Sequence, residues 1–281
     1  MRTAATAQLA LLLEVAATPK PGNVDRERDH DDLRFEHFLA GAVGARDGLL
    51  SMTDPSTGVG EAFEHAVAGM AERAGRNTQF GALLVLAPLV RAAAREDCGL
   101  DAEGVERVVV ATSVEDAAGF YRAFDHVDVA VRDPPEGMAL LDVRRGADAV
   151  DELRDRSLTL AEVMDRSADR DGVAREWVAG HERVFTAAQA IAALDGPVTD
   201  RAAEVFLELL SREPDTFVAD THGTETARSV MVRAQEAREG GPQLVQAFAE
   251  SLVAEGINPG TTADIVAGAL FVAMERDGVS P

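Results

Sequence analysis

The sequence predicts an all-α protein, a single-domain multi-helix bundle over residues 1–281 with a short irregular excursion in the middle. Apolar residues recur at helical spacing over most of the chain, strand signals are sparse, and no repeat of fixed period is present. Hydrophobic residues make up 46% of the 281 residues, which is enough to bury a large core. Aromatic residues make up only 5%, so we expect that core to consist mainly of Leu, Val, Ala, Ile and Phe.

Helical periodicity is clearest in six segments, 4–17, 32–52, 59–74, 80–96, 244–253 and 265–274. The last of them, IVAGALFVAM, carries no polar group and is too short to span a membrane, so we expect a core helix. Residues 105–112 are rich in β-branched side chains and fit a strand, yet the residues after them continue the segment as a helix. Residues 127–150 are expected to form the irregular excursion because they contain Pro134, Pro135, Gly137 and Gly146.

The chain is strongly acidic, and its basic side chains are almost all arginine. The formal net charge is −22, and Lys20 is the only lysine. An acidic surface depleted of lysine is typical of a halophilic protein, because at about 1 M salt the Debye length is only roughly 3 Å and self-repulsion is screened. Such a surface disfavours nucleic-acid binding. The alternative, an acidic face for a basic partner, is weaker because the acids are spread along the whole chain.

Cysteine usage and hydropathy limit the class of protein further. Cys98 is the only cysteine, so an intrachain disulfide and a cysteine-based metal site are excluded. The apolar run from Leu9 to Ala17 is broken by Glu14 and preceded by a single Arg, so it is too short for a membrane span and lacks the layout of a signal peptide. We therefore expect a cytoplasmic protein without a membrane partner, and the sequence leaves open a homo-oligomer. The histidines expected at the surface are His65, His126 and His181.

The rarest polar residue types gather in three loop-like motifs. These are ATPKPGNVD (17–25) with Lys20 and Asn23, GRNTQFG (75–81) with Asn77, and INPGTTAD (257–264) with Asn258. A chain that has almost lost Lys and Asn keeps them here, which indicates a site. The alternative is structural, since Asn is common in turns and caps. The TTAD segment also fits a helix cap, with the Thr261 hydroxyl accepting from the backbone three residues on and Asp264 favouring the helix N-terminus.

An acidic cluster follows the first of these motifs, with Asp25 and then Asp29, His30, Asp31 and Asp32. Carboxylates close together suit Mg²⁺, which usually takes one or two of them together with substrate phosphates. The alternative is a solvated helix start, which is also commonly acidic. A zinc site is not expected because no further His or Cys stands at ligand spacing.

In order and spacing, TPKPGNVD, HDDL, GRNTQFG and INPGTTADIVAGALFV resemble the motifs of the triphosphoribosyl-dephospho-CoA synthase family, the CitG-like proteins. The resemblance covers essentially the whole chain; its first motif is quite specific and the later ones are individually weaker. It implies a single all-helical domain that joins ATP to 3′-dephospho-CoA and releases adenine, making the precursor of a carrier-protein prosthetic group. The implied partners are ATP and a CoA-like or other nucleotide acceptor, and the implied cofactor is Mg²⁺.

The resemblance also implies roles for individual residues. The family reaction breaks the N-glycosidic bond at C1′ of ATP, so a carboxylate is expected near an oxocarbenium-like transition state. The candidates for catalysis are Asp25, His30, Asp32 and Asp264, of which Asp25, Asp32 and Asp264 are also candidates for binding Mg²⁺. Lys20 and Arg76 are expected to contact phosphate, and Asn77 and Thr78 phosphate or ribose hydroxyls. The full set of substrate-binding candidates is Lys20, Gly22, Asn23, Arg76, Asn77, Thr78, Asn258, Gly260, Thr261 and Thr262.

The chain departs from the family pattern at three positions. Gln79 and Phe80 stand where the family has His and often Lys, and Gln can form hydrogen bonds but cannot act as a base. Arg28 stands where a Gly often precedes the histidine that His30 matches. Three functions therefore remain open: transfer to dephospho-CoA, a Mg-dependent ribosyl-bond hydrolase or transfer to a different acceptor, and a non-enzymatic helical scaffold.

Overall fold

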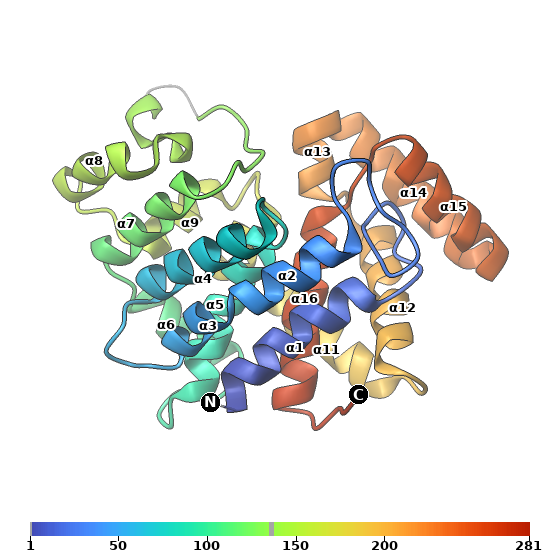
Figure 1. Cartoon of the computed structure of the whole chain (residues 1–281), viewed down its shortest axis with the longest axis horizontal. Helices are drawn as coiled ribbons and strands as arrows, with labels where there is room; N and C mark the ends of the chain where they lie inside the picture. Colours follow the sequence, from blue (N-terminus) through green and yellow to red (C-terminus); the bar gives the residue numbers. More distant parts are fainter. Residues whose placement is uncertain (1, 135–137) are drawn as a thin grey trace.

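The computed structural model describes residues 2–134 and 138–281, and the all-α prediction is confirmed because these residues contain sixteen α-helices and no β-strand. Figure 1 shows them as one bundle. The helices are α1 (Arg2–Ala16), α2 (Phe35–Gly44), α3 (Arg46–Met52), α4 (Val59–Ala74), α5 (Phe80–Ala94), α6 (Ala102–Val110), α7 (Val114–Arg122), α8 (Val150–Asp155), α9 (Leu160–Ser167), α10 (Gly172–Val178), α11 (Glu182–Ala193), α12 (Val198–Arg212), α13 (Thr216–His222), α14 (Thr224–Gly240), α15 (Pro242–Ala254) and α16 (Gly260–Glu275).

Helix α16 forms the centre of the bundle. It lies behind α1 and α2 in Figure 1 and packs against α1, α5, α11 and α12. All its residues from Ile265 to Met274 are buried, which confirms the prediction of a core helix over 265–274. Near the two ends of the chain, the Thr3 hydroxyl donates a hydrogen bond of 2.8 Å to the Glu275 carboxylate, which joins the start of α1 to the end of α16.

The segment predicted as one helix over 32–52 is two helices, α2 and α3. Gly44 at the end of α2 lies so close to Gly69 of α4 that a Cβ on Gly44 would collide with the Gly69 carbonyl oxygen. Ala45 separates the two helices, and both α2 and α3 pack on α4. Helix α4 coincides with the predicted segment 59–74, and α5 ends two residues before the predicted 96.

The strand considered for 105–112 is wrong, because these residues belong to α6 and the turn after it. The helix also does not run on continuously. Ser113 starts the new helix α7 with a capping box, in which its side chain accepts from the Asp116 amide and Asp116 accepts from the Ser113 amide. Within the predicted excursion 127–150, the described residues contain two short 3₁₀ turns, Ala139–Leu141 and Val143–Ala149. Pro135 and Gly137 lie outside the described residues.

One histidine was placed wrongly by the sequence. His181 is fully buried rather than exposed, and its ring lies 3.3 Å from the Val85 carbonyl oxygen. Burial lowers the pKa of His181 to about 3, so the ring is neutral and serves packing. His65 and His126 are exposed, as predicted. Of the described helices, none combines the length and the apolar character that crossing a bilayer requires.

Candidate functional site

A cavity of about 230 Å³ opens where the helices α5, α10, α13 and α16 begin. Helix N-termini create positive potential, although side chains here already accept from several of the first amides, namely Asp171 at α10, Thr261 at α13 and Asp215 at α16. The polar residues of its wall are Glu14, Asn23, Asn77, Thr78, Gln79, Asp171, Thr216, Asp220, Asn258, Thr261 and Asp264. The motifs around Asn77 and Asn258, 181 positions apart in the chain, therefore meet at one cavity, together with Asn23 of the first motif.

The first motif reaches the cavity because Gly22 permits a close approach. Gly22 has φ of +75°, and a Cβ there would collide with the Ile257 carbonyl oxygen. His30 fixes the same turn from the other side, since its Nε2 lies 2.7 Å from the Gly22 carbonyl oxygen. In Figure 1 this loop after α1 lies beside α13 and the turn that precedes α16. Gly22 and His30 thus hold two motifs together, and neither lines the cavity.

Lys20, the only lysine, is fully buried and does not line the cavity. Its ammonium group forms an ion pair with Glu14 of α1 and donates a hydrogen bond of 2.6 Å to Asn23 Oδ1. Asn23 in turn donates from Nδ2 to Asn258 Oδ1 at 2.8 Å. The network fixes Glu14 in the cavity wall with a cation directly behind it. Burial raises the pKa of the Glu14 carboxyl, and the charge of Lys20 opposes that rise.

Asp264 is the second carboxyl group of the inner wall. It lies on the first turns of α16 and reaches the start of α5, where a Cβ on Gly81 would collide with its carboxylate. Burial raises the pKa of Asp264 well above its usual value, and the negative charge of Glu14 raises it further. Two carboxyl groups with raised pKa values in one cavity are a frequent property of catalytic and cation-binding sites.

Gly81 is expected to matter because it leaves room for Asp264. In a Gly81→Ala variant the methyl group displaces the Asp264 carboxylate, so we expect the catalysed rate to fall at least about tenfold while the protein stays folded. A steady-state assay, with circular dichroism to verify folding, measures this. Gly75→Ala is the matched control: a Cβ there meets nothing within 4 Å, so its φ of +71° should cost roughly 1–2 kcal/mol of stability without changing the rate. Equal rates for both variants would contradict the role given to Gly81.

The start of α16 is held by another helix, so the capping role considered for Thr261 within its own helix is wrong. The cap residue is Pro259, without a side-chain cap. The Thr261 hydroxyl instead lies 2.9 Å from the Thr216 hydroxyl and accepts from the Phe217 amide at 3.2 Å. Thr262 is buried and donates from its hydroxyl and its amide to Asp215, at 2.7 Å and 2.8 Å. Thr261 therefore belongs to the cavity wall, whereas Thr262 ties α16 to α13.

The motif 75–81 supplies side-chain oxygens that have no protein partner. The Thr78 hydroxyl oxygen and Gln79 Oε1 are buried without a hydrogen bond. Gln79 is held by its other amide atom, which donates to the Leu11 carbonyl oxygen at 3.3 Å. Asn77 accepts from the Phe80 amide at 3.2 Å and so lies at the start of α5. Because buried polar atoms are normally paired, the oxygens of Thr78 and Gln79 are available to a ligand.

The three carboxylates predicted to bind Mg²⁺ do not meet. Asp25 is fully buried and accepts hydrogen bonds from Thr18, the Lys20 amide and Arg28, so its role is to hold the loop. Asp32 is exposed and lies with Arg76 at a separate surface hollow. Only Asp264 lines the cavity, and the described residues contain no group of three or more His, Cys, Asp or Glu arranged for a metal ion.

The wall of the cavity is anionic. It contains four carboxyl groups, and no Lys, Arg or His is among the described residues that line it. Sequence reasoning did not select the carboxyl groups of Glu14, Asp171 and Asp220. The signal for Glu14 was present, since it is the only charged residue between Leu9 and Ala17. Asp171 and Asp220 carried no such signal because acids surround both of them in the sequence.

The fold and this cavity define an all-helical protein with an anionic site built from helix N-termini. The chain belongs to the CitG family, ATP:dephospho-CoA triphosphoribosyl transferase, whose model matches residues 1–280. It is similar to the crystal structure of a protein from Archaeoglobus fulgidus assigned as a triphosphoribosyl-dephospho-CoA synthase. That match has 27% identity and a TM-score of 0.70, and it covers 86% of this chain and 98% of the other. No curated protein matches. The resemblance carried by the four sequence motifs is thus confirmed.

Proposed function

We propose that the chain transfers the triphosphoribosyl group of ATP to the ribose 2′-hydroxyl of 3′-dephospho-CoA and releases adenine. In this reaction the bond from C1′ to adenine breaks, a bond from C1′ to the acceptor oxygen forms, and the proton lost by the hydroxyl balances the proton gained by adenine. The observation that carries the proposal is that Glu14, Gln79 and Asp264 meet at one cavity in a chain of the CitG family.

Glu14 is the carboxylate that we assign to the reacting carbon. Positive charge develops at C1′ as adenine leaves, and a fixed carboxylate stabilises it. Lys20 and Asn23 hold Glu14 from behind, so its position does not depend on the ligand. Lys20 then acts by positioning Glu14, and the expected contact of Lys20 with phosphate gives way to this role because the ammonium group is fully buried.

We propose Mg²⁺ as the cation that brings the triphosphate into this anionic cavity. The available donors are all oxygens, namely the Asp264 carboxylate and the unpaired atoms of Thr78 and Gln79, and such donors suit Mg²⁺. The ion supplies positive charge to the triphosphate. The positive potential at the starts of α5 and α16 would add to it, with Asn77, Asn258 and Gly260 around them.

Adenine release is the experiment that tests the proposed function. The protein is incubated with MgATP in about 2 M KCl, because a chain of charge −22 needs salt to screen its self-repulsion. We expect adenine to appear when 3′-dephospho-CoA is present, together with a triphosphoribosylated adduct in mass spectrometry. Adenine and free ribose triphosphate without acceptor would instead establish the hydrolase. If neither product forms although MgATP binds, the chain uses another acceptor. If MgATP does not bind, the non-enzymatic scaffold is the remaining function.

Removal of Mg²⁺ should abolish the reaction at the level of ATP binding. Free ATP would meet four wall carboxyl groups, of which only Glu14 and Asp220 have a cationic partner among the described residues, in Lys20 and Arg132, so we expect its affinity to fall at least about tenfold with EDTA present. Isothermal titration with ATP, with and without Mg²⁺, measures this. Readdition of Mg²⁺ is the control, and an unchanged affinity in EDTA would contradict the assignment of the cation.

The composition supports a cellular setting for this activity. The charge of −22 and the single lysine favour the cytoplasm of an organism that accumulates salt. Dependence of the folded state on KCl concentration tests this part, since a protein adapted to dilute cytoplasm should fold without added salt. The oligomeric state, including a homo-oligomer, is measured by size-exclusion chromatography with light scattering in the same buffer.

A further inference from the structure

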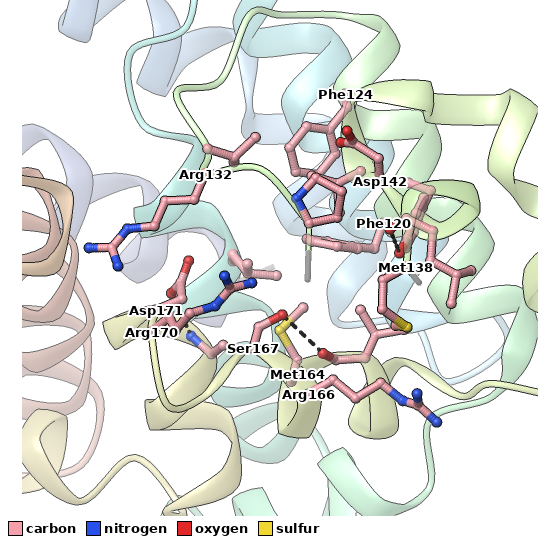
Figure 2. A pocket seen from close by; sticks show the side chains of 18 of the residues that line it. Phe120, Phe124, Arg132, Met138, Asp142, Met164, Arg166, Ser167, Arg170 and Asp171 are labelled. Atoms are coloured by element: carbon pink, nitrogen blue, oxygen red, sulfur yellow. Dashed lines mark hydrogen bonds between the residues drawn. The ribbon is translucent and has the colours of Figure 1, made fainter. Parts of the chain in front are cut away.

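A second cavity, of about 160 Å³, adjoins the reaction cavity. It lies between α7, the end of α9 and the described residues of 131–134 and 138–143 that line it, and Figure 2 shows it from close by. Six residues line both cavities, so the two share a wall and ligand parts in them would be neighbours. These shared residues are Leu84, Phe120, Phe124, Val131, Asp171 and Asp220.

The interior of the second cavity is apolar and narrow. Figure 2 shows Phe120, Phe124 and Met138 on one side of it and Met164 with Ser167 on the other. Its aromatic rings pack on one another edge to face, with an interplanar angle of 83° between Phe120 and Phe124 and a centroid distance of 5.3 Å. Rings in that arrangement do not form the parallel pair that would sandwich a flat base. The methionines are flexible and adapt to a thin aliphatic chain.

The rim of this cavity carries arginines, which the reaction cavity lacks. Arg132 is paired with Asp220, whereas Arg166 and Arg170 form no ion pair with the described residues. The acids nearby already have partners. Asp142 pairs with Arg144, and Asp171 accepts from the amides at the start of α10. Figure 2 shows Arg170 next to Asp171, on the side of the wall that both cavities share. Arg170 can therefore meet an anionic group of a ligand at the shared wall, whereas Figure 2 shows Arg166 extending away from it.

We propose that this second cavity binds the pantetheine arm of the acceptor dephospho-CoA, with Arg170 at the adjoining pyrophosphate. The inference rests on the proposed function, because it places the acceptor's 2′-hydroxyl in the reaction cavity. The acceptor has the required order of chemical groups: a ribose that reacts, a pyrophosphate beside it, and then a long, flexible arm whose aliphatic stretches are joined by amides. An apolar cavity behind a cationic rim, joined to a polar reaction cavity, matches that order.

ATP fits the second cavity less well. A triphosphate has no use for an apolar interior, because burying its charge there would be costly without paired cations. Adenine is a rigid flat ring, and the edge-to-face arrangement of Phe120 and Phe124 offers it no parallel pair of faces, whereas a flexible arm can bend around these rings. The charge and the apolar lining together thus favour the acceptor.

Two variants test the arm and the rim separately. Ser167→Trp fills the cavity from the end of α9, and Arg170→Ala removes the exposed cation. For both, we expect the Kd and the KM of dephospho-CoA to rise about tenfold or more, while the KM of ATP stays within about twofold. Titration calorimetry gives the Kd and the adenine assay gives both KM values. Arg228→Ala is the control, since Arg228 is exposed and lines neither cavity.

The other outcomes distinguish a failure of the arm-binding inference from a failure of the proposed transferase function. A raised KM for ATP with an unchanged Kd for dephospho-CoA would give the second cavity to ATP. Unchanged constants in both variants would overturn the inference and leave the transferase intact. If the unmodified protein binds dephospho-CoA but releases no adenine, the proposed function fails, and the Kd values of the variants still decide the cavity. No binding of dephospho-CoA by the unmodified protein would overturn both.

Discussion

An Asp264→Asn variant should lose at least about 100-fold in the rate of adenine release and at the same time unfold at a higher temperature. The rate falls because Asp264 is the carboxyl group that links the starts of α5 and α16 in the cavity wall and that we assign to the Mg²⁺ ion. The stability rises because Asn removes a negative charge that the folded state buries close to Glu14.

The pH dependence of stability gives this prediction a sign that can be checked. Burial and the charge of Glu14 raise the pKa of Asp264 above its usual value of 3.8, so the folded protein keeps the proton after the unfolded chain has lost it. Stability of the unmodified protein therefore falls as pH rises from 3.8 towards the raised pKa, and Asn lacks this loss. In metal-free buffer, the difference in Tm between variant and parent should grow as the pH rises above 3.8.

A matched change elsewhere separates the local effect from a general loss of negative charge. Glu236→Gln removes the same charge from an exposed position in the interior of α14, so we expect neither the rate nor the Tm to change measurably. If Asp264→Asn kept its rate within a few-fold of the parent, the carboxyl group would have no part in the chemistry. A lowered Tm would contradict the view that its buried charge destabilises the apo protein.

The helices were predictable because their signals are local. Apolar spacing and the capping and breaking residues around it predicted α4 with its observed bounds and α16 as a core helix. The close contact of Gly44, the last residue of α2, with Gly69 was not predictable, because Gly69 belongs to another helix. The burial of His181 has the same kind of cause, since its partner carbonyl at Val85 is 96 positions away.

The sequence predicted which motifs meet at the cavity, but it did not predict what each of their residues does there. Rarity alone pointed to Asn23, Asn77 and Asn258, and all three line the cavity. The same argument selected Lys20, but rarity does not tell which group a side chain contacts. Charge suggested phosphate for Lys20, whereas α1 places Glu14 against it. Asp25 and Asp32 were selected because acids are dense around them in the sequence. In the structure Asp25 holds the loop through hydrogen bonds, and Asp32 is exposed at the surface.

A Lys20→Met variant should lose roughly 3–5 kcal/mol of the free energy of unfolding, because it leaves Glu14 buried without its cation. Asn23 would also lose the donor for its Oδ1, and its bond to Asn258 would lose support. Urea unfolding in about 2 M KCl, followed by circular dichroism, measures the loss. Arg228→Met is the control for removal of an exposed cation and should change stability by less than about 0.5 kcal/mol.

The double variant Glu14→Gln with Lys20→Met decides between a positioning role and a phosphate contact. Removing both charges leaves no unpaired buried ion, so stability should return to within about 1 kcal/mol of the parent even if Lys20→Met alone does not fold. The rate of adenine release should not return, because the carboxylate assigned to C1′ is gone. If Lys20→Met instead kept the parental stability and lost only affinity for ATP, Lys20 would be a phosphate ligand. Recovery of both stability and rate in the double variant would remove Glu14 from the chemistry and leave the pair a purely structural role.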